Sequence, residues 1–299
     1  MINKSYMLLL LSVISVSFSS ILIVTIKANP LTISFYRMLF TTIIIFVILI
    51  LNKKSLNEFK NIKLKNFFIM IIIGIVLALH FSLWITSLKL TSVASSVILV
   101  STHPIIVAPI SHIFFKEKLS KINIVGIALA IFGVIALVYG NYGLSSITID
   151  SMWGNILALF GGIAAGFYIL GGRKIRKSIS LINYTFVIYS ISTITLFFIC
   201  ITFSAPIYNV GIGDLQLIFV MAIISGIFGH TLYNWLLKYI KTSIISVALL
   251  GEPLGSTLLA YSIPWINQIP SIYTIIGGLI IIVGVYLTAK NKKIKKYEI

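Results

Sequence analysis

Long apolar runs alternate with short connections along the whole chain, and the connections carry most of the charge. A helix needs about 20 mostly apolar residues to cross a bilayer, and ten runs reach that length. Ten-residue segments in which apolar and polar positions alternate strictly are absent, so the pattern does not favour a membrane barrel. The short connections indicate antiparallel neighbouring helices. The ten predicted spans cover residues 5–26, 31–51, 66–87, 92–115, 122–140, 152–171, 181–203, 215–236, 242–264 and 272–289.

The composition indicates a protein that is solvated mainly by lipid. Of the 299 residues, 59% are hydrophobic and only 10% are charged, and the mean hydropathy is +1.11. About a quarter of the residues of a soluble domain are charged. The first apolar run follows a basic start, as in a signal peptide, but it continues to about residue 26 and has no small-x-small cleavage site. We therefore predict that this run is retained as the first span.

The positive charges lie mostly between the spans. The formal net charge is +17. With ten spans, 20 of the 23 Lys and Arg residues fall on one face, Lys27 and Lys89 fall on the other, and Arg37 lies inside the second span. Cytoplasmic loops carry the excess of Lys and Arg in membrane proteins. This division predicts cytoplasmic N- and C-termini and a multi-pass protein of the cell membrane. No amphipathic basic segment is present, so we do not expect nucleic-acid binding.

The two halves of the chain share features that recur in the same order. Five spans per half is an odd number, so the second half enters the membrane from the opposite face, as in many secondary transporters. We predict an all-α integral membrane fold of ten transmembrane helices in a 5+5 inverted-topology repeat. Residues 1–140 would form the first five-helix unit and residues 141–299 the second. A shift of 149 positions places Leu88-Lys89 on Leu237-Lys238 and His103-Pro104 on Glu252-Pro253, and a shift of 151 places Gly126, Gly133 and Val134 on Gly277, Gly284 and Val285.

This organisation resembles the drug/metabolite transporter superfamily, in particular its EamA-type branch, over nearly the whole chain. The resemblance implies a secondary transporter that exports or exchanges small solutes such as amino acids, metabolites or drugs. The chain departs from the family pattern at residues 267–271, where the family often repeats a Glu-containing loop, and in the first span, where serines replace a frequent Trp-Gly. The segments that carry the resemblance are Asn29-Pro30, Ser34-Phe35-Tyr36-Arg37, Leu88-Lys89-Leu90-Thr91-Ser92-Val93-Ala94, Phe115-Lys116-Glu117-Lys118-Leu119-Ser120 and Leu250-Gly251-Glu252-Pro253-Leu254.

Two ionisable residues precede prolines at matching places of the two halves. Glu252 is the one acidic residue inside a predicted span, and a carboxylate in hydrocarbon is costly unless it faces a cavity or a partner. It is a candidate cation or proton site, or else a structural hydrogen-bonding group. His103 suits a proton relay or an anionic group of a solute, or a neutral bond to a neighbouring helix. Pro104 and Pro253 each remove a backbone N–H, and we expect them to kink their helices and free a carbonyl of the preceding turn.

Polar or aromatic side chains form stripes on three further spans, of which the first span carries Ser12, Ser15 and Ser19. His80 and Trp84 are one helical turn apart, and His230, Tyr233 and Asn234 form a second stripe. Such faces suit the path of an organic solute. Trp84 also fits an interfacial belt, because it lies near the end of its span. Tyr168 follows a group of small residues that favour close helix packing, and we expect it to point into a cavity. For Arg37 we favour a structural role, by snorkelling or by pairing with a carbonyl or a lipid phosphate.

Other chemistry has little support. Cys200 is the only cysteine, no nucleotide-binding GxxxxGK[ST] motif occurs, and the four histidines and six acids form no metal-binding pattern. We expect no cofactor and no enzyme activity. The sequence favours a secondary transporter that moves a small organic solute, such as an amino acid or related metabolite, by alternating access. Protons are a candidate coupling ion, and simple facilitated exchange is the alternative. A membrane receptor or scaffold, or a membrane-embedded enzyme, are the competing interpretations.

Overall fold

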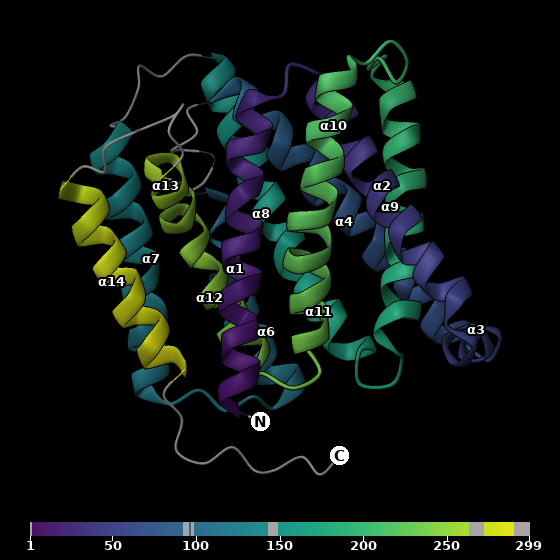
Figure 1. Ribbon diagram of the computed structural model, residues 1–299. Helices are drawn as coiled ribbons and strands as arrows, with labels where there is room; N and C mark the ends of the chain where they lie inside the picture. The colour runs from purple at the N-terminus through teal and green to yellow at the C-terminus, as the bar shows by residue number, and fades with distance from the viewer. Residues whose placement is uncertain (1, 92–95, 97–98, 143–148, 263–271, 290–299) are drawn as a thin grey trace.

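The computed structural model describes residues 2–91, 96, 99–142, 149–262 and 272–289, and every regular element in these ranges is helical (Figure 1). The helices run back and forth across one bundle. The start of α1 and the end of α14 lie on the same side of it. The elements are α1 (Ile2–Thr25), α2 (Pro30–Leu51), α3 (Lys53–Lys60), α4 (Leu64–Leu90), α6 (His103–Phe115), α7 (Lys121–Tyr142), α8 (Ile149–Ile175), α9 (Leu181–Thr202), α10 (Ile212–Met221), the π-helix η1 (Ala222–Thr231), α11 (Leu232–Leu236), α12 (Thr242–Ala248), the 3₁₀ turn η2 (Leu249–Gly251), α13 (Glu252–Ser262) and α14 (Ile272–Ala289).

Among the described residues, six helical segments are long and apolar enough to cross a membrane, and all six coincide with predicted spans. Shorter apolar stretches occur in α6, α7 and α14. The six long segments are Lys4–Ile23, Pro30–Leu51, Leu64–Leu90, Ile149–Ile175, Leu181–Thr202 and Ile212–Leu236.

Both proline-containing spans depart from regular α-helix just before their prolines, at residues 101–102 and 249–251. In the span predicted at 92–115, residues 92–95 and 97–98 lie outside the described part, and α6 begins at His103, so Pro104 stands in its first turn. In the span predicted at 242–264, α12 gives way to a 3₁₀ turn, and α13 begins at Glu252. Proline is favoured at the first positions of a helix, where its missing N–H costs nothing. Pro104 and Pro253 therefore stand in the first turns of α6 and α13, and the kinks expected at them stay a prediction.

The carbonyl expected to be freed by Pro253 finds a partner inside the chain. The backbone N–H of Glu252 donates to the carbonyl of Leu249, which closes the 3₁₀ turn. The tighter turn thus replaces the hydrogen bond that proline cannot make. This carbonyl is engaged by the backbone, contrary to the expectation that it would be free for a solute.

The span predicted at 215–236 is a helix of mixed type. The α10 helix continues into a π-helical segment, Ala222–Thr231, and then into the short α11. Within the π-helix, the Thr231 hydroxyl donates to the carbonyl of Gly226, five residues earlier, at 2.9 Å. Hydropathy does not distinguish helix types, so this segment could not be predicted from the apolar pattern. π-helical turns occur often at functional sites.

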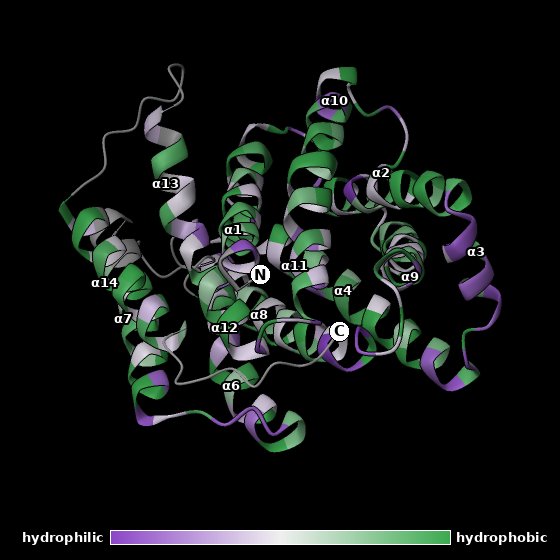
Figure 2. Cartoon of the chain, turned by 60° about the horizontal axis from the view of Figure 1, so that its bottom comes forward, coloured by the Kyte–Doolittle hydropathy of each residue, from purple (hydrophilic) through white to green (hydrophobic). Residues whose placement is uncertain are grey.

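Helices α7 and α14 lie side by side in both views and pack closely through glycines (Figures 1 and 2). A Cβ atom placed on Gly126 would lie 2.6 Å from the backbone nitrogen of Thr288, and one on Gly284 would lie 2.5 Å from that of Ala130. Small residues let membrane helices approach until their backbones touch. The glycines that the sequence repeat matched thus lie in the contact between α7, the last helix of the first half, and α14, the last described helix of the second.

The polarity of the bundle is opposite to that of a soluble protein. Figure 2 shows hydrophobic residues along the helix flanks and hydrophilic residues on α3 and at helix ends. Large apolar side chains such as Ile72, Phe198 and Leu279 are about 60% exposed, whereas Ser12, Arg37 and Asn234 are almost fully buried. Lipid solvates such an outer surface, and the interior holds the polar groups.

We predict that Gly284→Ala destabilises the protein and that Gly213→Ala does not. The new methyl group at position 284 would meet backbone atoms, whereas nothing lies within 4 Å of the corresponding point at Gly213. Overpacking of this kind costs about 1–3 kcal/mol. Thermal unfolding of the two variants in the same detergent measures the difference. Equal melting temperatures for the two variants would contradict the tight contact between α7 and α14.

Candidate functional site

A cavity of about 50 Å³ lies in the interior of the bundle, and residues of both halves of the chain form its wall. Seven of the eight residues that the sequence predicted for the solute site border it: His80, Trp84, His103, Tyr168, His230, Tyr233 and Glu252. The eighth, Asn234, lies behind this wall and bonds to two of its members. The remaining lining residues are Val16, Ser19, Val100, Ser101, Ala165, Ile169 and Leu249.

His80 and Trp84 stack against each other on the α4 side of the cavity. Their rings are nearly parallel, with centroids 5.9 Å apart and an interplanar angle of 5°. The Nδ1 atom of His80 lies 2.9 Å from the carbonyl oxygen of Gly161. Because a carbonyl only accepts hydrogen bonds, Nδ1 carries the hydrogen. Trp84 is 5% exposed, so it belongs to the interior and not to an interfacial belt.

Asn234 positions the aromatic groups contributed by α8 and η1. Its side-chain nitrogen donates to the Tyr168 hydroxyl at 2.5 Å and to the His230 carbonyl at 2.8 Å. The Tyr233 hydroxyl lies 2.7 Å from Nδ1 of His230. These bonds fix two phenol rings and one imidazole ring around one side of the cavity. Asn234 therefore acts on the site through its neighbours.

The two residues that precede prolines meet the same cavity from different segments. Nδ1 of His103 lies 2.7 Å from the hydroxyl of Ser246 on α12. The Ser20 hydroxyl of α1 donates to Oε1 of Glu252 at 3.4 Å, and the Ser17 hydroxyl donates to the Glu252 carbonyl at 3.3 Å. Each ionisable group thus has a neutral hydroxyl as its neighbour. Either could exchange that bond for one to a solute without breaking an ion pair.

The serines of α1 attach this helix to the π-helix. The Ser12 hydroxyl donates to the Gly229 carbonyl at 2.9 Å, and the Ser225 hydroxyl donates to the Ser15 carbonyl at 2.8 Å. The third serine of the stripe, Ser19, borders the cavity, and its hydroxyl has no partner among the described residues. The stripe therefore serves packing at one end and lines the cavity at the other.

The glycines of α8 serve helix packing, as expected. A Cβ atom on Gly162 would lie 2.7 Å from the carbonyl oxygen of Val100, and one on Gly154 would lie 2.8 Å from the backbone nitrogen of Thr91. These close approaches bring the segment before α6 and the end of α4 against α8. Tyr168, six residues beyond Gly162 on α8, borders the cavity.

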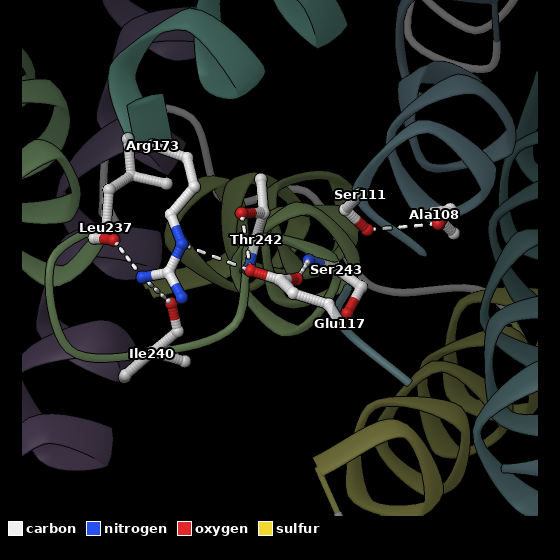
Figure 3. A network of polar contacts seen from close by, with 8 residues as sticks. All are labelled: Ala108, Ser111, Glu117, Arg173, Leu237, Ile240, Thr242 and Ser243. Atoms are coloured by element: carbon white, nitrogen blue, oxygen red, sulfur yellow. Dashed lines mark hydrogen bonds and ion pairs between the residues drawn. The ribbon is translucent and has the colours of Figure 1, made fainter. Parts of the chain in front are cut away.

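A polar network that sequence reasoning did not single out lies where α6, α8 and α12 meet (Figure 3). The Nε atom of Arg173 forms an ion pair with Oε1 of Glu117 at 3.1 Å, and both side chains are less than 10% exposed. The Glu117 carboxylate also accepts from the backbone N–H of Thr242 at 2.9 Å and from its hydroxyl at 3.0 Å. Arg173 donates to the carbonyls of Leu237 and Ile240.

This network holds the helix ends of one face together. Glu117 caps α12, a favourable place for a negative charge because the N-terminal N–H groups of a helix are unpaired. Arg173 satisfies carbonyls of the connection between α11 and α12. In the sequence Glu117 belonged to a segment of the family resemblance, and Arg173 was counted among the loop charges. Their place in two short clusters of charge gave no sign that they would be buried together.

The cavity is small compared with an organic solute. A single water needs about 10–15 Å³ of such space, so about 50 Å³ accommodates a few waters. Within the described residues, no group of three or more His, Cys, Asp or Glu side chains could hold a metal ion. The arrangement suits reversible binding of a solute by hydrogen bonds and ring contacts, after the walls have moved apart.

Comparison with known proteins gives the family. The sequence model described as "EamA-like transporter family" matches residues 3–139 and matches again at residues 152–290. The chain belongs to this family. The two matches cover nearly all of it, one in each half. The resemblance derived from the sequence motifs is thereby confirmed.

Curated relatives of this EamA-like chain are described as transporters. "Uncharacterized transporter YyaM" of Bacillus subtilis is 24% identical over 240 residues, which is 78% of this chain and 77% of the relative. An "uncharacterized transporter" of Archaeoglobus fulgidus is 26% identical over 269 residues, 88% of this chain and 90% of the relative. A crystal structure superposes with a TM-score of 0.78 at 14% identity and covers 95% of this chain and 96% of that one. This similarity shows that the fold is shared.

We predict that Glu117→Ala strongly destabilises this EamA-like protein. It leaves the Arg173 guanidinium buried without its carboxylate, and removing one member of a buried pair costs about 3–5 kcal/mol. The double variant Glu117→Leu/Arg173→Met removes both charges and should recover most of the loss. Unfolding free energies of the single and double variants test this coupling.

Glu58→Ala is the matched control for this cycle. Glu58 is half-buried on α3 and accepts one backbone hydrogen bond, from Ser180 at 3.0 Å. Its loss should cost about 1 kcal/mol. If the double variant is as unstable as Glu117→Ala, the ion pair is not what holds these helix ends.

Proposed function

We propose that this chain is a secondary transporter that moves a small organic solute, such as an amino acid or related metabolite, across the cell membrane by alternating access. The chain belongs to a transporter family, and its relatives are described as transporters. The observation that carries the proposal is the interior cavity. Its wall carries the aromatic and polar side chains that a solute site needs. The outer surface of the same bundle is apolar and suited to lipid.

The proposal includes ten spans built from two five-helix units of opposite orientation, residues 1–140 and 141–299, with cytoplasmic termini. Two separate matches to one family model support this division. The contacts between helices support this division as well. In two cases, a contact between the two units has a counterpart in which the equivalent helices of the two units have changed places. Helix α4 packs on α8 as α1 packs on η1, and α6 packs on α8 as α1 packs on α13. The helices α2 and α9 pair with each other, and so do α7 and α14, as counterparts on a two-fold axis would.

Alternating access follows from these features. The cavity lies where the two units meet and is too small for an organic solute, so loading requires the units to move relative to each other. The packed pairs α2–α9 and α7–α14 would stay together as the hinges of this motion. The interrupted segments before His103 and Glu252 would adjust the cavity wall, since irregular backbone inside a membrane is tolerated where it borders a cavity.

The eight predicted residues would share the work of binding in this proposal. His80 and Trp84 offer a ring face. Tyr168 and His230 offer hydrogen-bonding groups and are held by Asn234, and the Tyr233 hydroxyl bonds to His230. His103 and Glu252 are the ionisable groups at the two helix starts. Glu252 is the candidate for a proton or for a cationic group of the solute, because its carboxylate is held only by a neutral serine hydroxyl in the described structure.

We predict that Glu252→Gln and His103→Ala each lower transport by about tenfold or more, since loss of one well-placed contact of about 1.4 kcal/mol has that effect. The Gln side chain keeps the size of Glu252 and its ability to bond Ser20. Counterflow in proteoliposomes, with a panel of amino acids and related metabolites, measures the rates. Glu58→Gln is the matched control, because it removes an acid of α3 outside the cavity.

The same assay with an imposed pH gradient separates the two candidate driving forces. If protons pass through Glu252, the gradient accelerates wild-type uptake and has no effect on Glu252→Gln. If the protein is an exchanger, the gradient has no effect on either. Wild-type rates in both Glu252→Gln and His103→Ala would overturn the assignment of the site.

A further inference from the structure

Arg37 is the most deeply buried charged side chain in the described part of the molecule. It lies in the second turn of α2 and is 1% exposed. Neither Nη1 nor Nη2 has a hydrogen-bond partner among the described residues. The contact that the guanidinium does make is with the ring of Phe81, whose centroid is 4.4 Å from Cζ. Snorkelling and pairing with a carbonyl, the structural roles favoured from the sequence, are therefore not what the structure shows.

The other two buried arginines show how this fold satisfies a guanidinium when the role is structural. Arg173 pairs with Glu117 and donates to two carbonyls, and Arg176 donates to the carbonyls of Asn234 and Ile179. Both lie at the end of α8. Arg37 alone of the three has no carbonyl or carboxylate within hydrogen-bonding distance of its terminal nitrogens in the described structure. A buried charge without such partners is costly and requires an explanation.

The guanidinium is next to the solute cavity. Arg37 borders a second, smaller cavity of about 10 Å³ together with Thr41, Phe81, Tyr189 and His230. His230 also lines the central cavity. The Phe81 ring lies 5.0 Å from the His80 ring and 5.1 Å from the His230 ring. The side chains of Phe81 and His230 thus stand between Arg37 and the central cavity, and a change of their rotamers would join the two spaces.

We propose that Arg37 binds a carboxylate group of the transported solute after Phe81 and His230 move aside, an inference that rests on the proposed transport function. The planar guanidinium presents paired donors that match the two oxygens of a carboxylate. Among the described residues, no other Lys or Arg borders either cavity. One cation balances one carboxylate, whereas a phosphate group, with nearly two negative charges at neutral pH, would leave about one charge uncompensated. The site therefore favours carboxylates over phosphates.

Glu252 does not form an ion pair with Arg37 in the described structure. The carboxylate borders the central cavity and accepts from Ser20 at 3.4 Å, and no ion pair joins it to Arg37 within 4.0 Å in the described structure. The Glu252 carboxylate and the Arg37 guanidinium can therefore each bind a different group of the solute. This leaves the terminal nitrogens of Arg37 free to receive an anionic group of the solute.

Matched pairs of compounds test the inference on the purified full-length protein. Each pair differs only in its acid function: leucine and leucinamide, phenylalanine and phenylalaninamide, 3-phenylpropionate and 3-phenylpropanamide. Glycerol 3-phosphate serves as the phosphate probe, and a wider metabolite panel includes neutral and cationic solutes. Thermal stabilisation in detergent and counterflow in proteoliposomes are measured for the wild type, Arg37→Met, Arg37→Lys and the control Lys89→Met, which removes an exposed charge at the end of α4.

We expect at least one acid to stabilise the wild type and to be transported at least tenfold faster than its amide. Arg37→Met should abolish that preference, Arg37→Lys should weaken it, and Lys89→Met should keep it. Without any solute, Arg37→Met should melt no lower than the wild type, because replacing an unpaired buried charge by an apolar side chain of similar length removes a cost.

Three results would overturn the assignment of Arg37 while leaving the transport function intact. The wild type could transport amides, phosphates or cations as well as it transports acids. Arg37→Met could keep the preference for acids. Arg37→Met could melt far below the wild type in the absence of solute, which would make Arg37 a structural residue. If the wild type transports no compound of the whole panel, the proposed function itself fails and the role of Arg37 with it.

Discussion

The absence of water inside a bilayer is the constraint on which this structure depends. Every polar group at membrane depth must find a partner within the protein or face an internal cavity. The outer faces of the helices are accordingly apolar, with side chains such as Phe198 exposed by 60%. Ser12 of α1, His80 and Asn234 are buried, and their side chains bond to carbonyls. The interior cavity is the place where these inward-facing groups meet.

Departures from regular α-helix occur where the ionisable groups border the cavity. His103 begins α6, Glu252 begins α13 after a 3₁₀ turn, and His230 lies in the π-helix. Irregular backbone has unpaired groups, so it is stable inside a membrane only where protein or a cavity satisfies them. The Ser12 hydroxyl of α1 satisfies the Gly229 carbonyl of the π-helix, and a 3₁₀ bond satisfies Leu249. The same features that loosen the helices thus place titratable side chains at the centre of the bundle.

The sequence predicted the spans and the stripes well because both are local properties. Length and hydropathy located six long helices, and helical spacing placed His80 with Trp84 and His230 with Tyr233 on one cavity wall. The change of helix type before Pro104 and Pro253 could not be predicted in detail, because a proline alone does not specify which hydrogen bonds replace the one it removes. Before Pro253 that bond is the 3₁₀ bond from Glu252 to Leu249. The π-helix left no mark in the hydropathy pattern.

The buried charges were the hardest to place from the sequence, because burial of a charge is decided by tertiary contacts. Glu117 and Arg173 lie in clusters of loop charges, yet they pair in the interior of one face. Arg37 lies near a helix end, where an arginine commonly snorkels, yet it is enclosed against Phe81. Only the neighbours distinguish these cases.

The two faces of the bundle are joined by unlike interactions, and this difference bears on how the molecule opens. On the face with the ends of α6 and α8, a buried ion pair and a capped helix connect Glu117, Arg173 and Thr242. On the opposite face, neutral bonds join Thr32 to the Pro206 carbonyl at 2.7 Å and Tyr36 to the Ile207 carbonyl at 2.6 Å. Neutral hydrogen bonds contribute about 1 kcal/mol each, whereas bonds to charged groups contribute about 1.5–3. Among the described contacts, the ion pair and the capped helix of the Glu117 face are therefore harder to separate than the bonds of Thr32 and Tyr36, which favours opening at the latter face.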